Sequence, residues 1–124
     1  MNWDKINDQL KVCVVAESGR YRAARDAENL RQQDEEADAA FERLLKPRVS
    51  QLAYAASRKL GVITSLRVRV RPLVNHIDKT AKSFITIGWA GKCGRFEIED
   101  IAKSDADIAR IIDRFSKTIA INRT

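Results

Sequence analysis

Aromatic residues, cysteine and histidine are all scarce in this sequence. Of its 124 residues 6% are aromatic, two are cysteine and one is histidine. So few rings predict a core built mainly from aliphatic side chains and alanine. The two cysteines are not arranged in a CxxC or a Cys/His cluster, which a structural zinc site would require. We therefore expect neither a metal ion nor any other cofactor.

Long apolar segments are missing as well. The longest unbroken apolar run is Val12 to Ala16, far short of the roughly 20 residues of a membrane span. The first ten residues carry two acids and a lysine, which a secretory signal would not contain. We expect no membrane association, a cytoplasmic location and reduced thiols.

Recognisable catalytic motifs are absent too, with no phosphate loop, serine elbow or paired carboxylates. His76 and Asp78 suggest an acid–base or metal pair, with Cys93 as a further ligand or as a nucleophile. One histidine with one carboxylate does not make a metal site, so a surface-loop histidine is our default interpretation. An enzyme or small-ligand binder remains a third hypothesis, which predicts an enclosed pocket containing His76 or Cys93.

The positive charge of the chain is concentrated in its middle. The net charge is +6, yet residues 1–57 hold nine basic and ten acidic groups, and residues 96–124 hold five and six. Residues 58–95 hold nine basic groups and one acid, Asp78. This distribution predicts one localised surface that faces an anionic partner.

Residues 1–61 have the composition of a helical region. Asn2 is a good N-cap, and Gly61 follows a basic turn, as at many helix ends. Two places are possible breaks, Ser18-Gly19 and Pro47, and Ser18-Gly19 is alternatively a weak point that a continuous helix tolerates at a cost of about 1 kcal/mol. Because the apolar phase continues through Pro47, we expect a kink there with no reversal of direction.

A thin heptad-like seam runs along this helical region. A helix of about 40 residues would measure roughly 60 Å, longer than a compact domain of this size. We therefore expect a second copy of the chain to cover the seam, as a homodimer; a helical hairpin that packs on itself is the alternative. The residues assigned to self-association are Ala23, Ala27, Leu30, Ala37, Phe41 and Leu44.

Residues 62–124 change to the period of strands. Alternating patterns predict strands over 65–74, 83–90 and 95–100, with a loop at 75–82 and a turn at 91–94. Ser104 and Asp107 predict the start of a final helix, whose apolar stripe should cover the sheet. The whole chain is thus expected to form one α+β domain, a helical region followed by an antiparallel meander packed against a C-terminal helix.

Three arginines stand at alternate positions of the first strand, in the stretch SLRVRVRPL. They would form a row about 7 Å apart on one face, like phosphates along a nucleic-acid strand. They could instead lean across the short Thr86 and Gly88 to meet Glu97 and Glu99. A third possibility is the acidic run 34–38 of another subunit. The candidate anion-binding residues are Arg67, Arg69, Arg71, Lys79, Lys82, Lys92 and Arg95.

The sequence GKCG at 91–94 has the GxxG pattern of one class of RNA-binding loop. That loop joins two helices, whereas strands flank it here, so a hairpin turn explains the glycines. The leading hypothesis is a non-enzymatic, homo-oligomeric interaction module that presents a basic sheet face to an acidic protein or subunit. Sequence-nonspecific nucleic-acid binding through the arginine strand is the alternative.

Overall fold

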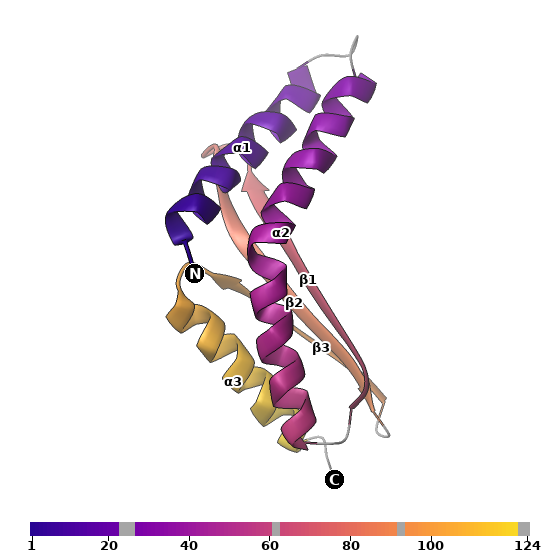
Figure 1. Ribbon diagram of the computed structural model, residues 1–124. Coiled ribbons are helices and arrows are strands. Elements are labelled where there is room, and N and C mark those ends of the chain that lie inside the picture. The colour runs from indigo at the N-terminus through magenta and orange to yellow at the C-terminus, as the bar shows by residue number, and fades with distance from the viewer. Residues whose placement is uncertain (23–26, 61–62, 92–93, 122–124) are drawn as a thin grey trace.

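The computed structural model describes residues 1–22, 27–60, 63–91 and 94–121. It confirms an α+β fold, and Figure 1 shows the three helices gathered on one side of a sheet. In chain order the elements are α1 (Trp3–Arg22), α2 (Ala27–Leu60), β1 (Ile63–Asn75), β2 (Thr80–Gly91), β3 (Gly94–Ala102) and α3 (Asp105–Ile121).

The helical region divides at one place, between α1 and α2. The expected cap is present, since the Lys5 backbone N–H donates to Asn2 Oδ1 over 3.2 Å. Helix α1 passes through Ser18 and Gly19 without interruption, so the break suggested there is not where the chain turns. Helix α2 likewise continues through Pro47, and Figure 1 shows that its axis changes direction part-way along. A proline removes one hydrogen bond of the ladder, which bends a helix without ending it.

Helix α1 lies antiparallel along α2, and the two make one of the larger contacts in the fold (Figure 1). With 34 residues α2 is about 51 Å long, which exceeds the span of a compact domain of this size. Its apolar side is covered by α1, the sheet and α3 of the same chain. Helices α1 and α2 therefore form a helical hairpin within one chain.

The sheet is an antiparallel meander in the order β1-β2-β3. All three strands are longer than predicted, and β1 and β2 extend toward one another because the turn between them is tighter than the expected 75–82 loop. Asn75 Oδ1 accepts the N–H groups of Ile77 and Asp78 at 2.9 and 3.2 Å, closing an Asx-type turn. Lys79 then adopts φ 54°, the left-handed conformation that brings the chain into β2.

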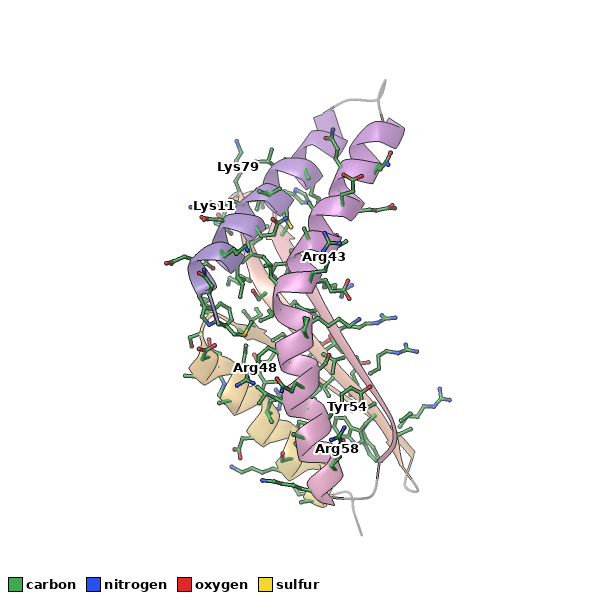
Figure 2. All side chains as sticks on the ribbon, viewed as in Figure 1. Lys11, Arg43, Arg48, Tyr54, Arg58 and Lys79 are labelled. Atoms are coloured by element: carbon green, nitrogen blue, oxygen red, sulfur yellow. The ribbon has the colours of Figure 1, made fainter. Side chains whose placement is uncertain are left out.

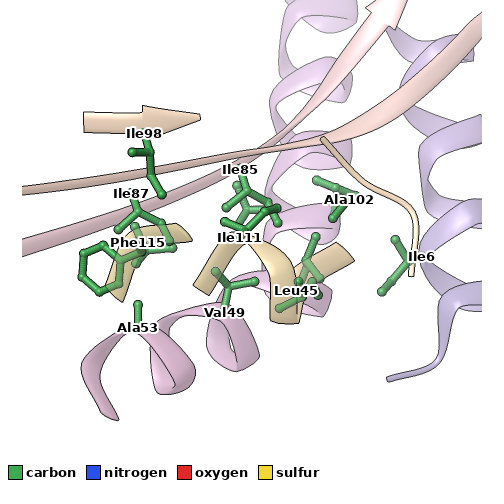
Figure 3. Packing of buried hydrophobic residues seen from close by; sticks show 14 of the residues in the cluster. Ile6, Leu45, Val49, Ala53, Ile85, Ile87, Ile98, Ala102, Ile111 and Phe115 are labelled. Atoms are coloured by element: carbon green, nitrogen blue, oxygen red, sulfur yellow. The ribbon is translucent and has the colours of Figure 1, made fainter. Parts of the chain in front are cut away.

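The core lies between the inner face of the sheet and the helices. Figure 3 shows Ile85, Ile87 and Ile98 of the sheet facing side chains of α2 and α3. The predicted stripe of α3 is buried at Ile108, Ile111, Phe115 and Ile119, and Phe115 meets Trp89 edge-to-face at 5.0 Å between ring centroids. The predicted cap also forms: the Asp107 N–H donates to Ser104 Oγ at 3.3 Å, and the Lys103 N–H donates to Asp107 Oδ2 at 2.8 Å.

Candidate interaction surface

The side of the sheet turned away from the helices, called the open face here, carries no helix of the described part of the chain (Figure 1). Along β2 the residues Ser83, Ile85, Ile87 and Trp89 are buried, and those between them are only half-buried. Strand period explains this alternation, since successive side chains point to opposite faces. The open face is formed by Arg67, Arg69, Arg71, Leu73, Lys82, Phe84, Thr86, Gly88, Ala90, Arg95, Glu97, Glu99 and Ile101.

The three arginines of β1, called the β1 arginine row, are all exposed. The register places Arg67 opposite Gly88, and Gly88 opposite Glu97. Arg69 lies opposite Thr86 in the same way, and Thr86 opposite Glu99. This is the register that a cross-strand ion pair would need, with two strand spacings, about 9.6 Å, between the outer backbones.

The ion pairs with the β3 glutamates nevertheless do not form. Within the described ranges, no carboxylate lies at ion-pair distance from a guanidinium of the β1 arginine row. Spanning nearly 10 Å would require two long side chains to extend toward one another and lose rotamer freedom, for a gain of about 0.2–1 kcal/mol at an exposed site. The positive charge of β1 therefore faces solvent uncompensated.

One member of the row has an aromatic neighbour. The guanidinium carbon of Arg71 lies 5.3 Å from the ring centroid of Phe84, which is directly opposite on β2. A cation over a ring face is stabilised by about 0.5–1 kcal/mol at exposed sites. The contact holds Arg71 against the sheet, and it also covers the aromatic ring that a nucleic-acid base would need for stacking.

The remaining candidate cations are distributed unevenly. Lys82 and Arg95 lie on the open face and are exposed. Lys79 lies instead at the β1–β2 turn, near α1, where Figure 2 labels it. Lys92 is outside the described residues.

Acidic residues occupy the opposite edge of the same face. Glu97 and Glu99 are both exposed on β3, so the open face has a basic band along β1 and an acidic band along β3. At one end of the sheet, Arg67, Arg95 and Glu97 line a depression of about 560 Å³. Its floor includes Gly88, where an added Cβ would meet nothing closer than 3.8 Å. The sequence pattern already placed Glu97 and Glu99 on this face, whereas the depression is a feature that the sequence analysis missed.

The residues assigned to self-association prove to be largely internal. Phe41 and Ala37 are buried, 0% and 6% exposed, in the core of their own chain, and Leu44 is half-buried against it. Phe41 and Ala37 therefore leave little exposed apolar surface for a second copy of the chain, and self-association through this seam stays a prediction. Ala23 and the side chains of Ala27 and Leu30 lie outside the described residues.

The residues considered for catalysis are not brought together. His76 Nε2 lies 3.1 Å from Glu17 Oε1 of α1, at an exposed site. Asp78 accepts a hydrogen bond from Asn75 Nδ2 at 3.2 Å. Cys93 lies outside the described residues. Among the described residues no group of three or more His, Cys, Asp or Glu side chains is placed to hold a metal.

Comparison of the chain with protein-family models, curated proteins and solved structures gave no match. Over the ranges that the structure describes, every helix is too short or too polar to cross a membrane.

Proposed function

We propose that this protein is a non-enzymatic interaction module whose β1 arginine row binds an acidic surface of a protein partner. The observation that carries the proposal is the row itself: three exposed guanidinium groups, in register with two glutamates, that make no ion pair with any described carboxylate. Arginines placed this way present several donors each in a planar fork, which matches carboxylates well.

The division of charge on the open face favours a protein over a nucleic acid. A nucleic-acid strand laid across the face would bring phosphates close to Glu97 and Glu99, which repel them. Phe84, the half-buried ring of the open face, is covered by Arg71, so base stacking has no free platform there. An acidic protein segment can instead follow the basic band and avoid the acidic one.

The test is the affinity of the full chain for a fluorescein-labelled peptide of about ten residues, rich in glutamate and long enough to follow one strand. Arg69→Glu should weaken binding about tenfold or more at low ionic strength, with a loss of affinity as salt rises. Arg43→Glu is the matched control, because Arg43 is exposed on α2 (Figure 2) and the substitution changes the net charge equally. It should change the affinity less than about twofold.

Equal weakening by the two substitutions would show that only net charge matters and would overturn the proposal. A labelled single-stranded DNA of similar length is measured in parallel. If it binds more tightly than the peptide and depends on Arg69, nucleic-acid binding through Arg67, Arg69, Arg71 and Arg95 replaces the protein partner.

A further inference from the structure

Strand β1 is an edge strand, with no second strand paired to it in the described part of the chain. It pairs with β2 alone, over twelve matched positions from Ile63 to Asn75. In the part of the chain that the structure describes, no other backbone or side-chain group hydrogen-bonds to β1 between Ser65 and Val74. An edge of this length presents a row of unpaired amide and carbonyl groups to solvent, which another strand can use.

Pro72 indicates which amide groups face that free side. Proline has no N–H, so inside a sheet it takes positions where the ladder needs none. Pro72 lies opposite Ser83 in the middle of the pairing with β2, and alternate residues of an antiparallel strand bond to the same side. The amides of Leu66, Val68 and Val70 therefore point to the free edge, whereas those of the arginines bond to β2.

The side chains beside this edge differ on its two faces. Toward the open face, every second residue is an arginine of the β1 row. Toward the helices, Val68 and Val70 are buried, and Tyr54 of α2 is 47% exposed on the side of that helix along which β1 runs in Figure 2. A strand added here would thus meet cations on one of its faces and an exposed aromatic ring on the other.

We infer that the free edge of β1 accepts an extended segment of a partner protein as a fourth strand, with carboxylates at every second residue and apolar residues between them. This rests on the proposed function and specifies the form in which the acidic partner binds. The added backbone would lie about 4.8 Å from β1, which places its acidic side chains beside Arg67, Arg69 and Arg71 at cross-strand distance. Backbone hydrogen bonds would supply affinity and the alternating carboxylates specificity.

Charge complementarity is what selects this occupant. A neutral or basic strand would bring no compensation for three cations standing about 7 Å apart. An acidic helix would present carboxylates at every third or fourth residue, which does not match a period of two.

The experiment uses the full chain and a labelled peptide in which glutamate alternates with valine or threonine. A control peptide has the same composition with its glutamates in one block. Alternation should bind about tenfold more tightly, because only it aligns every carboxylate with the row. Equal affinities would overturn the strand model while leaving the proposed function intact.

N-methylated peptides test whether the bound segment forms backbone hydrogen bonds with β1. Two further peptides carry N-methyl groups on alternate amides, one on the odd-numbered and one on the even-numbered positions. One peptide should lose about tenfold or more in affinity, because its methyl groups replace the N–H donors that face β1, and the other should bind like the parent. If both bind like the parent while Arg69→Glu still abolishes binding, the contact is side-chain electrostatics alone and the added strand is excluded.

A second copy of the chain is the rival occupant, since β3 is the other edge strand of the sheet and carries Glu97 and Glu99. Light scattering on the chain alone distinguishes the two. A monomer of 14.0 kDa that binds the alternating peptide supports a separate partner. The inference of a separate partner would be overturned in favour of self-association by two results together. The chain would form oligomers that the peptide dissociates, and the double variant Glu97→Lys, Glu99→Lys would form none.

Discussion

Among the described residues, arginines are paired with a carboxylate on the covered face of the sheet and are unpaired on its open face. On the side covered by the helices, Asp100 of β3 lies within 3.8 and 3.7 Å of the guanidinium groups of Arg110 and Arg114 on α3. On the open face, three arginines in register with two glutamates form no ion pair with described residues. The difference is one of reach: α3 packs directly on β3, whereas β1 and β3 are separated by a whole strand. It teaches that the β1 arginines stay unpaired because no neighbouring element of the described chain brings a carboxylate within their reach.

The largest expected effect comes from the same substitution made on each face. Phe115→Ala should lower the free energy of unfolding by about 3–5 kcal/mol, because the ring is fully buried and its removal leaves a cavity. Phe84→Ala should cost only about 1–2 kcal/mol, since that ring is half-buried and loses mainly its contact with Arg71. Urea unfolding followed by circular dichroism measures both; losses of equal size would show that the open face is also a packed one.

A smaller effect, the loss of stability at alkaline pH, tests the burial of the Cys13 thiol on the covered side of the sheet. Cys13 is fully buried, and its Sγ donates to the Ala37 carbonyl at 3.4 Å. Burial, and next the charge of nearby Asp38, raise the pKa of the Cys13 thiol from 9.0 to about 12. The raised pKa means that the folded chain keeps the proton when the unfolded chain has lost it. The resulting stability is complete below pH 9 and declines as the pH rises toward 12.

The measurement compares the chain with its Cys13→Ala variant, both in a Cys93→Ser background. The difference between their free energies of unfolding should shrink by about 1.4 kcal/mol from neutral pH to about pH 10. Other alkaline groups titrate equally in both proteins and cancel. A constant difference across this range would mean that the thiol ionises as easily in the folded state.

The smallest expected changes in stability distinguish the paired arginines of α3 from the β1 arginine row. Asp100→Asn should destabilise the fold by about 0.5–1 kcal/mol, because it removes the carboxylate shared by Arg110 and Arg114. Converting Arg67 and Arg69, the two members of the row without an aromatic contact, to glutamine should not destabilise it, and at low salt should stabilise it by a few tenths of a kcal/mol by relieving repulsion. Thermal unfolding of the Asp100→Asn variant and of the glutamine variant, each at two salt concentrations, measures both changes in stability. Destabilisation by the glutamine variant would mean that the row serves the fold of its own chain.

Local patterns in the sequence predicted much of this fold. The period of two placed the arginines of β1 on the face opposite Val68 and Val70, and the capping residues Asn2 and Ser104 marked where α1 and α3 begin. These features depend on neighbouring residues of one element, so they can be seen along the chain. Ser18-Gly19 was open to two interpretations, a break or a weak point that costs a helix roughly 1 kcal/mol, and the structure shows it inside α1.

Sequence alone therefore determined the type and order of the elements, the faces of the strands and the concentration of charge in residues 58–95, because each follows from short-range periodicity or composition. Only the tertiary structure decided that α1 folds back on α2 and buries Phe41, that Glu17 meets His76, and that Glu97 stays too far from Arg67 to pair with it. Those outcomes depend on distances between elements far apart in the chain, which packing sets and local patterns do not encode.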